Sequence, residues 1–440
     1  MPQSVWDDST TIKKFDSLPG DTKTDILIIG GGLCGILCAW FLHREGADYM
    51  LVEKGRIGEG NTQNTTAKIT SQHGLIYSRL LRSLGRERAA MYLDANQKAI
   101  EEYRKLAGNI DCDFKEKTAG VYSCDDPKAI EQELRALEAL GFAAKYAERL
   151  PLPEEIKLKA AVLFPRQAQF HPLKFLAGAA ENLNIHENTF VHGVDGHTAY
   201  TDKGKITAGK IIVATHFPFL NKRGSYFLKL YQNRSYAVAL EHAGDVNGMY
   251  IDAAKGGLSF RNYGSLLLLG GGGGRTGTRH GGWRMLREFA ASAYPGAREL
   301  YSWAAQDCMS LDGMPYIGNY SLHTPDLYTA SGFNKWGMTS SMAAALLLRD
   351  LVLGRENIYR ELFSPSRSML KPQLFLNGLE ASKNLLTPTL KRCPHMGCAL
   401  KWNPLEHTWD CPCHGSRFEG DGKLMENPAV RDASSLKDSS

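Results

Sequence analysis

Long uncharged apolar runs are missing from this chain of 440 residues. No window of about eighteen residues is apolar throughout and free of charge, so we expect no membrane span. Residues 1–21 hold no apolar stretch of the kind found in signal peptides, and we therefore expect a cytoplasmic protein. A basic run is also missing. The 52 basic and 47 acidic residues leave a net charge of only +5, which gives no reason to expect nucleic acid as a partner.

Cysteine, by contrast, is well represented and unevenly spread. Nine cysteines are present, and four of them, at positions 393, 398, 411 and 413, are concentrated near the end of the sequence. In a cytoplasmic protein such a concentration favours metal binding over structural disulfides. The remaining composition, 43% apolar and 22% charged, is ordinary for a globular protein, and the length suggests two or three domains.

A strand, a turn and a helix near the start carry a cofactor motif. Residues 24–29 predict a buried strand and residues 33–44 a buried helix. Between and within them Gly30, Gly32 and Gly35 satisfy G-x-G-x-x-G, and the next predicted strand ends in Glu53, followed by Lys54. Gly30 permits the tight turn, Gly32 lets a pyrophosphate approach, and Gly35 lets the helix pack closely. The helix N-terminus can bind phosphate and Glu53 a ribose, so this context predicts a dinucleotide site.

The rest of the chain divides into recognisable stretches. Helices are predicted over 86–107, 127–141 and 337–353, and a buried strand over 210–215. Segments 226–240 and 247–270 alternate strand-like runs with turns, which predicts an antiparallel sheet inserted between cofactor-binding segments. Residues 366–390 contain prolines and are predicted to be a linker. From 391 onward the composition shifts to Cys, His, Gly and Pro.

Three segments decide between FAD and NAD. They are GRIGEGNTQNTTAKITSQHG after the second strand, GKITAGKIIVATHFPF, and SLDGMPYIG followed by LYTASGFNKWGMTSS. Together they resemble the FAD-dependent oxidoreductases of the D-amino-acid oxidase, glycine oxidase and sarcosine oxidase type, over about residues 20–360. The resemblance implies an α/β fold, with a Rossmann-like FAD-binding domain and an inserted antiparallel-sheet substrate domain.

The same resemblance implies boundaries and cofactor contacts. The oxidoreductase would occupy 1–365, with FAD-binding segments at about 22–80, 150–220 and 305–365 and the substrate domain at about 81–149 and 221–304. The implied FAD contacts outside the glycine motif are Thr65, Thr66, Val191, Ala214, Gly337 and Met338. Gly337 and Met338 would begin a helix aimed at the flavin ring, where a helix N-terminus stabilises negative charge.

The cysteine-rich end has its own pattern. C-x-H at Cys393 and His395 is followed by C-x-x-H at Cys411 and His414. With the two extra cysteines this resembles the Rieske family, in the branch found in respiratory and photosynthetic cytochrome complexes. The resemblance implies a small all-β module at 391–440, in which these four residues ligate a [2Fe–2S] cluster. It also implies a disulfide between the extra cysteines, Cys398 and Cys413. Zinc remains the alternative, because Cys2His2 ligation also suits zinc.

Two departures from that family have consequences. The strands that usually precede the first ligand loop have no room here, so the module should pack on the flavin domain for stability. Ser416 can donate a hydrogen bond to a bridging sulfide, but Phe418 stands where high-potential relatives have tyrosine. The missing hydroxyl predicts a reduction potential in the middle or lower part of the Rieske range.

The substrate side is less marked. Arg261 is a candidate for binding a substrate carboxylate, and His73 and Tyr250 are further catalytic candidates, although each suits a structural role as well. We expect a dehydrogenase that oxidises a small organic donor, an amine, amino acid or related C–N compound, and passes electrons singly through the cluster to an unknown acceptor such as a redox protein. The alternative is an electron-transfer component that serves a partner enzyme and has no small organic substrate of its own.

Overall fold

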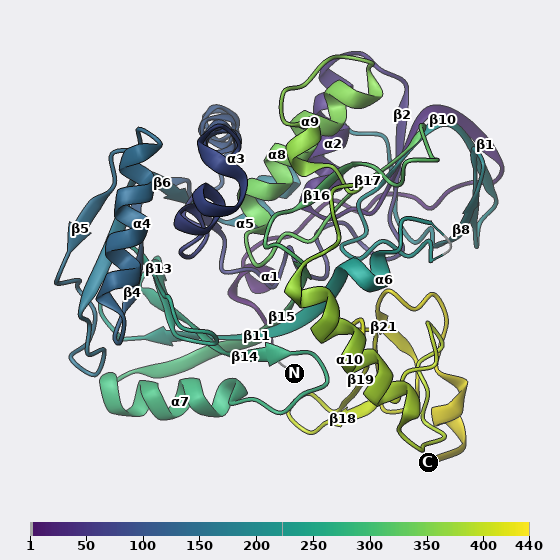
Figure 1. Cartoon of the computed structure of the whole chain (residues 1–440). Helices are drawn as coiled ribbons and strands as arrows, with labels where there is room; N and C mark the ends of the chain where they lie inside the picture. The colour runs from purple at the N-terminus through teal and green to yellow at the C-terminus, as the bar shows by residue number, and fades with distance from the viewer. Residues whose placement is uncertain (1–2, 222, 440) are drawn as a thin grey trace.

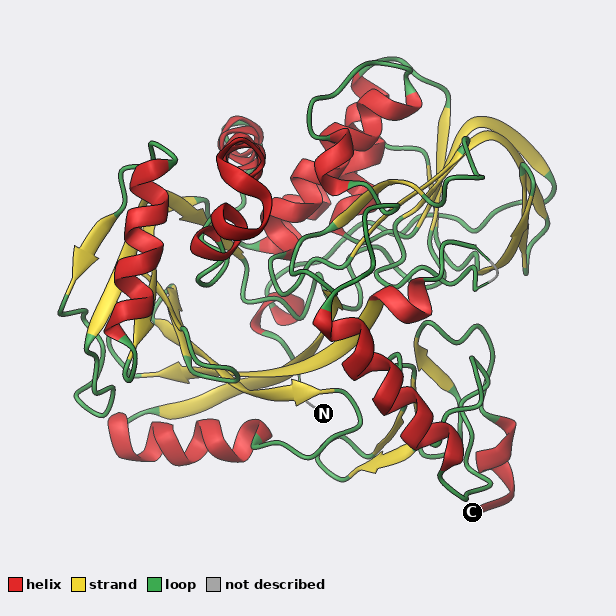
Figure 2. Cartoon of the chain, in the orientation of Figure 1, coloured by secondary structure: helices red, strands yellow, loops and turns green. Residues whose placement is uncertain are grey.

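The computed structural model describes residues 3–221 and 223–439. The secondary structure falls into two large sheets with helices around them and a small separate module (Figures 1 and 2). Within the described residues, no helix combines the length and the apolar character needed to cross a membrane.

The cofactor-binding part is an eight-stranded, mostly parallel sheet. Its central strands are β1 (Thr22–Ile29), β10 (Lys205–Val213), β2 (Tyr49–Val52), β7 (Ile185–His186) and β17 (Leu327–Ser331), all parallel to their neighbours. Strand β16 (Tyr316–Asn319) pairs antiparallel at one edge, and β8 (Val191–Asp195) and β9 (Thr198–Thr201) form a hairpin beside β10. The last four residues of β1 are all buried, which is why this strand reads as an unbroken apolar run.

Helices pack on this sheet, and two of them, at residues 33–44 and 337–352, lie where the sequence predicted helices. Helix α2 spans Leu33–Arg44, as expected, and packs on α8 (Gly337–Val352) and α5 (Pro172–Ala180). Because β1 and β10 are paired in register up to Ile29 and Val213, the turns that follow them lie side by side. Gly30 has φ +113°, and a Cβ there would lie 2.7 Å from the carbonyl oxygen of Ala214. The first glycine of the motif is therefore required by both backbone angle and space.

The second sheet has nine strands and carries the inserted domain. The order is β15 (Arg298–Ser310), β11 (Leu230–Glu241), β14 (Leu266–Arg275), β13 (Ser259–Tyr263), β12 (Met249–Asp252), β4 (Lys115–Ser123), β6 (Ala160–Gln169) and β3 (Lys68–Ile69), with β5 (Lys145–Ala147) on β6. All pairs are antiparallel except β12 with β4. The antiparallel sheet expected from 226–270 is thus confirmed. Strands β3 and β6 also belong to it, although they lie in segments expected to bind FAD.

Helices α3 (Tyr77–Ala107), α4 (Pro127–Ala139) and α7 (Gly282–Ala293) surround this sheet. Helix α3 is kinked at Gly85, where φ is +79°, and the predicted helix 86–107 is the part after the kink. Short helices α1 (Val5–Asp8), α6 (Tyr226–Lys229) and α9 (Arg360–Phe363) complete the larger part.

The predicted linker 366–390 is wrong as a description of the backbone, because it contains helix α10 (Pro372–Leu386). Its prolines do not prevent a helix: Pro372 occupies the first turn, where its missing N–H is not needed, and Pro388 lies beyond the end. Asn377 accepts a hydrogen bond from Arg275 Nη1 (3.0 Å), and the carbonyl of Asn384 accepts one from Ala399 N (3.0 Å). The helix thus joins the nine-stranded sheet to the small module.

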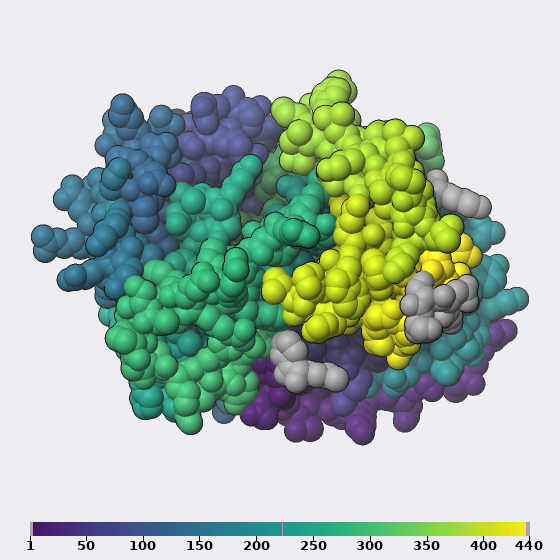
Figure 3. Space-filling view, turned by 90° about the horizontal axis from the view of Figure 1, so that it is seen from below, coloured from purple at the N-terminus to yellow at the C-terminus, as the bar shows by residue number. Residues whose placement is uncertain are grey.

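The small module is a four-stranded antiparallel sheet with long loops. Its strands are β18 (Lys401–Asn403), β19 (Thr408–Asp410), β20 (Arg417–Phe418) and β21 (Leu424–Glu426), followed by the 3-10 helix η1 (Ser434–Ser439). As expected, the module packs on the larger part of the chain, and its yellow surface lies directly against green residues in Figure 3.

A buried ion network holds the module in place. Arg234 on β11 donates through Nε to Glu406 Oε1 (3.0 Å), and Arg417 on β20 donates to Glu406 Oε2 (2.9 Å). Arg417 also binds Asp410 (3.0 Å) and Glu426 (3.0 Å), and both arginines are at most 3% exposed. Burial favours a raised pKa for Glu406, but the charges of Arg234 and Arg417 outweigh it and lower the pKa to about 2. Glu406 is therefore ionised and shared between the module and the sheet.

Glu406→Gln should loosen the module. Removing one partner of a buried ion pair costs roughly 3–5 kcal/mol, and the lower end applies here because Asp410 and Glu426 still pair with Arg417. Hydrogen–deuterium exchange of residues 391–436 measures the free energy of opening. Glu419→Gln, on an exposed residue of the same module, is the control.

The effect should depend on pH in a defined direction. A carboxyl whose folded pKa is lowered from 4.5 to about 2 contributes its full stabilisation above the ordinary value and loses it as the pH falls toward 2. The stability difference between the wild type and Glu406→Gln should therefore close between pH 4.5 and pH 2. A difference that stays constant over that range would contradict the role of the Glu406 charge.

Candidate functional site

A cavity of about 1280 Å³ opens where the two large sheets meet. Ten of the eleven residues expected to bind FAD line it: Gly30, Gly32, Glu53, Lys54, Thr65, Thr66, Val191, Ala214, Gly337 and Met338. The eleventh, Gly35, lies beneath, where a Cβ would collide with the carbonyl oxygen of Gly30. The two sheets therefore bring segments from both ends of the large part to one cavity.

Glu53 is set up to bind ligand hydroxyls from inside the protein. Its carboxylate accepts hydrogen bonds from Gly31 N (2.7 Å) and Gly55 N (3.0 Å), which fix its orientation at the end of β2. Burial raises the pKa of Glu53, although the two backbone N–H groups oppose that effect. The N-terminus of α2 faces the same cavity, and Leu33 N donates to Thr62 Oγ1 (3.1 Å). This arrangement fits a dinucleotide, with phosphate at the helix and ribose at the carboxylate.

The four expected metal ligands come together at the tips of two loops of the small module. Cys393 and Cys411 are buried free cysteines, and the ring centroids of His395 and His414 lie 4.8 Å apart with the two rings nearly perpendicular. Nδ1 of each histidine is buried without a hydrogen-bond partner. Such atoms are costly unless a ligand satisfies them. Two unpartnered imidazole nitrogens beside two thiols are the donor set of a Rieske [2Fe–2S] cluster.

The protonation states of these residues suit metal binding. Burial lowers the pKa of His395 to about 4 and that of His414 to about 3, so both rings are neutral ligands at neutral pH. A hydrogen bond with Cys393 lowers the pKa of Cys411, and backbone N–H groups of His414, Cys413 and Gly415 act in the same direction. The loop backbone is thus arranged to stabilise negative charge on sulfur.

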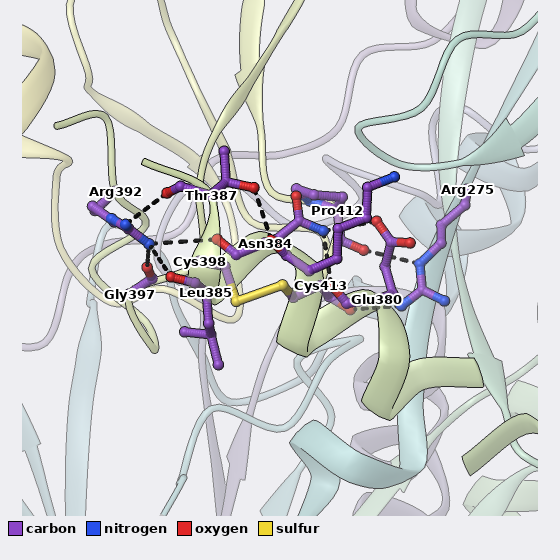
Figure 4. The surroundings of a disulfide bond; sticks show 11 residues. Arg275, Glu380, Asn384, Leu385, Thr387, Arg392, Gly397, Cys398, Pro412 and Cys413 are labelled. Carbon is purple, nitrogen blue, oxygen red and sulfur yellow. Dashed lines mark hydrogen bonds between the residues drawn. A yellow bond between two sulfur atoms is a disulfide. The ribbon is translucent and has the colours of Figure 1, made fainter. Parts of the chain in front are cut away.

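A disulfide between Cys398 and Cys413 clamps the two loops, in the pairing that the resemblance implied. Figure 4 shows the bond with one arginine on either side. Arg392 donates to the carbonyls of Thr387 (2.8 Å) and Gly397 (2.9 Å), which ties the end of α10 to the first loop. The Sγ atoms of Cys398, Cys411 and Cys413 lie within 4.8 Å of one another, so the disulfide shields one side of the cluster position.

The nine-stranded sheet holds the second loop by its backbone. Gln232 donates to the carbonyl of His414 (2.8 Å), and Gln306 donates to that of Gly415 (2.7 Å). Arg275 donates to the carbonyls of Pro412 (2.9 Å) and Cys413 (3.1 Å). Gly415 has φ +87°, and a Cβ there would lie 2.6 Å from the Gln232 side chain. Each carbonyl from 412 to 415 is therefore bound by a side chain of the larger part.

The cluster histidines face the larger part of the chain as well. His395 Nε2 lies 2.6 Å from Asn221 Oδ1, and the ring of Phe217 is 6.4 Å from the rings of both His395 and His414. Phe217 lies four residues after the end of β10 and three residues after the cavity-lining Ala214. A short stretch of backbone thus runs from the cofactor cavity to the cluster ligands.

The three catalytic candidates lie outside the described lining of the cavity. Arg261 is fully buried and donates through Nη1 to the carbonyls of Thr66 (2.9 Å) and Ala67 (2.7 Å), which makes it a support of that loop. His73 bonds Tyr92 Oη (2.7 Å) and the carbonyl of Thr70 (2.9 Å), and burial lowers its pKa to about 3. Tyr250 is buried in β12.

Sequence reasoning missed Lys68, which does line the cavity. It stands on β3, two residues after Thr66, and only 9% of it is exposed. The only sequence signal for Lys68 was its position within an expected FAD-binding segment. No pattern in the sequence distinguished this buried lysine from lysines that lie on the surface.

Comparisons with known proteins agree with this geometry. The family model "FAD dependent oxidoreductase" matches residues 25–351, and the model "Rieske [2Fe-2S] domain" matches residues 376–437, which favours an iron–sulfur cluster over zinc. A protein of Bacillus subtilis (strain 168), named as a Rieske 2Fe-2S iron-sulfur protein, YhfW, is 33% identical over 495 aligned positions, covering 98% of this chain and 96% of that protein.

Other relatives match only one of the two parts of the chain, either the Rieske module by sequence or the oxidoreductase part by structure. The cytochrome b6-f complex iron-sulfur subunit 3 of Nostoc sp. is 51% identical over 37 residues, covering 8% of this chain and 21% of that protein. The crystal structure of L-proline dehydrogenase from P. horikoshii superimposes with a TM-score of 0.67 at 21% identity, over 80% of this chain and 98% of the other. The crystal structure of glycine oxidase from Geobacillus kaustophilus superimposes with a TM-score of 0.63 at 22% sequence identity, over 79% of this chain and 99% of the other. These structural likenesses show the same fold. The chain belongs to the FAD-dependent oxidoreductase family and carries a Rieske [2Fe–2S] domain fused to it.

Proposed function

We propose that this protein is a dehydrogenase that oxidises a small C–N compound, such as an amine or amino acid, and passes electrons singly through its Rieske cluster to a separate acceptor. One observation carries the proposal: residues of both modules line the same cavity. Glu53 and Ala214 of the cofactor part and Met425 and Asn427 of the Rieske module are all in its wall. This shared wall supports a cofactor site and a cluster that are neighbours within one chain.

The connection between the two sites is direct. Ala214, Thr215 and His216 line the cavity, and the next residue, Phe217, packs against both cluster histidines. Asn427 of the Rieske module donates to the carbonyls of Thr215 and Phe217, both at 2.7 Å, and so holds this stretch against the module. Residues 214–217 thus form a short backbone link from the cavity to the cluster ligands, and they support transfer within the molecule.

The proposed roles of the two redox sites follow from the chemistry of the two cofactors. When bound, FAD supplies a two-electron hydride acceptor, and the cluster supplies a one-electron carrier. The chain's own residues position them: Glu53 and the α2 N-terminus orient the dinucleotide, while Gln232, Gln306 and Arg275 fix the cluster loop. A one-electron carrier beside a two-electron site supports an acceptor that takes electrons singly.

The class of donor is supported by the structural relatives. The structural neighbours include L-proline dehydrogenase, glycine oxidase and L-amino acid deaminase, which all act on C–N compounds. At 16–22% identity these matches establish fold only, so the donor is part of the proposal.

The proposal is tested by anaerobic addition of amino acids and amines to the purified enzyme. We expect a true donor to bleach the flavin absorbance and to produce a Rieske-type EPR signal in the same sample, with iron and labile sulfide present in equal amounts. If a reducing partner protein bleaches both centres while no small donor does, the chain is an electron-transfer component and the dehydrogenase proposal is wrong.

Cys393→Ser should separate the two half-reactions. Losing one thiolate ligand should abolish the Rieske EPR signal while FAD remains bound, because the dinucleotide residues lie on other elements. Flavin reduction by the donor should continue at about the wild-type rate. Reduction of a one-electron acceptor should fall by at least about tenfold, because losing even an outer-shell partner of a metal ligand typically costs about 10- to 100-fold in metal affinity or activity. Cys124→Ser, at a free cysteine away from the cluster, should leave both unchanged. Acceptor reduction at the wild-type rate without a cluster would show that the cluster is not on the electron path.

A further inference from the structure

Helix α10 and the chain after it expose much of the apolar surface of this protein. Eight of the sixteen large apolar side chains that are exposed in the described part of the chain lie between residues 370 and 396. The group that we call the α10 patch has exposed fractions from 42% to 88% and consists of Phe375, Leu379, Leu385, Leu386, Leu390 and Met396. A contiguous exposed apolar surface usually marks a place where something binds.

The helix has one side for its own packing and another that is left to solvent. Phe375, Leu379 and Leu386 follow one another at intervals of four and seven residues, which places them on one side of α10. The two buried residues of the helix, Asn377 and Asn384, fall on the opposite side. Figure 1 shows α10 at the outside of the molecule, beside the Rieske module. The apolar side is therefore not needed for the fold of this chain.

The α10 patch continues into the loop that carries the first cluster ligands. Arg392 donates to the carbonyls of Leu385 (3.0 Å) and Gly397 (2.9 Å), so it joins the end of the helix to that loop (Figure 4). Met396 belongs to the loop and directly follows the ligand His395. A molecule that covers the patch would therefore lie against the cluster loop.

The charges around the patch are mostly positive. Segment 371–392 holds four basic residues and a single acid, Glu380, whose carboxylate already accepts a hydrogen bond within the helix (2.7 Å). Lys383 lies on the apolar side of α10, and Lys391 lies between the last leucine of the patch and the cluster loop. Within the described part of the chain, neither lysine forms an ion pair with a carboxylate. This surface is complementary to a partner of negative charge.

We propose that the α10 patch and its lysines form the docking surface for the electron acceptor, and that this acceptor is an acidic protein that carries one electron at a time. Docking there brings the acceptor against the loop of residues 393–397. One electron then passes from the reduced cluster to the metal centre of the acceptor, and no bond is formed or broken. This inference rests on the proposed transfer of single electrons to a separate acceptor, and it names the chemistry of that acceptor.

The size and charge of the surface favour a transient carrier over a second copy of the chain. A helix of 15 residues is about 22 Å long, so helix and loop suit the transient redox complexes that bury less than about 1,200 Å² in total. Obligate dimers usually bury about 2,000 Å² or more, and a symmetric dimer would bring the same lysines face to face. The patch also extends beyond the helix to the ligand loop, which a carrier must approach and a membrane-surface helix does not require.

Stopped-flow mixing of the reduced holoenzyme with two haem proteins tests the inference without any organic donor. The holoenzyme is reduced with dithionite, freed of the excess, and mixed with cytochrome b5, which is acidic, or with cytochrome c, which is basic. We expect the second-order rate constant with cytochrome b5 to fall at least about tenfold as sodium chloride rises from about 0.02 M to about 0.5 M, because salt screens the attraction between exposed charges. The rate constant with cytochrome c should stay constant or rise.

Two variants of the surface should slow the reaction with cytochrome b5. Lys383→Glu reverses a charge and Leu386→Ser removes an apolar contact, and each should lower the rate constant at low salt by at least about fivefold. Both side chains are exposed, so the melting temperature and the Rieske EPR signal should stay as in the wild type. The matched controls are Lys128→Glu on α4 and Ile358→Ser just before α9, both exposed and away from α10, and they should react as the wild type does.

The outcomes that overturn the inference are distinct from one another. The same salt dependence for both cytochromes, or wild-type rates in both variants, would show that α10 does not dock an acidic carrier. Binding to phosphatidylglycerol vesicles that Leu386→Ser abolishes, with cytochrome b5 reduction unchanged, would assign the surface to a membrane. A dimer that Leu386→Ser converts to a monomer, again with unchanged reduction, would assign it to a second copy. Because dithionite supplies the electrons, these results are independent of whether a C–N donor reduces the flavin.

Discussion

Two buried arginines, Arg234 in the sheet and Arg417 in the Rieske module, share the carboxylate of Glu406, and the rest of the arrangement depends on this contact. Charges buried at an interface are stable only in the geometry that pairs them. The network therefore fixes one orientation of the module on the sheet and does not merely hold the two surfaces together. In that orientation the loop with Cys411 and His414 meets Gln232, Gln306 and Arg275, which bind its carbonyls in turn. The cluster histidines consequently face the cofactor domain.

This dependence explains how so small a module folds. Its buried apolar core is nine residues, four of them cysteines, far less than an independent domain usually needs. The disulfide and the cluster add internal connections, and the nine-stranded sheet and α10 supply the remaining surface. The same contacts that stabilise the module also hold its cluster loop against the cofactor domain, so the stability of the module and the proposed electron transfer depend on one interface.

The local features were predictable from the sequence because their signals are local. The helix Leu33–Arg44 follows a glycine turn and a buried strand, and four ligands with characteristic spacing identify the cluster without any knowledge of the fold. The helix α10 was missed because prolines near its two ends were interpreted as breaks, although Pro372 is in the position where a helix tolerates proline. Strands β3 and β6 were not predicted, and their pairing in the nine-stranded sheet depends on segments that are distant in the sequence.

The missed parts of the site depend on contacts between residues far apart in sequence. Glu406 meets Arg234 across 172 positions, and no pattern in either segment announces the pair. Arg261 was a reasonable candidate as a lone arginine on the substrate sheet, but only its full burial and its bonds to Thr66 and Ala67 show that it supports a loop. Lys68 shows the opposite case, a residue that nothing in the sequence gave reason to select. Its burial, and the absence of an ion-paired acid among the described residues, become visible only in the folded structure.

The central claim is that the flavin site and the cluster exchange electrons inside one molecule, and rapid-freeze EPR during a single anaerobic turnover tests it most directly. The rate at which the Rieske signal grows after flavin reduction should stay the same over a tenfold range of protein concentration. A rate that rises in proportion to protein concentration would show that the centres meet only between molecules, and would contradict the account.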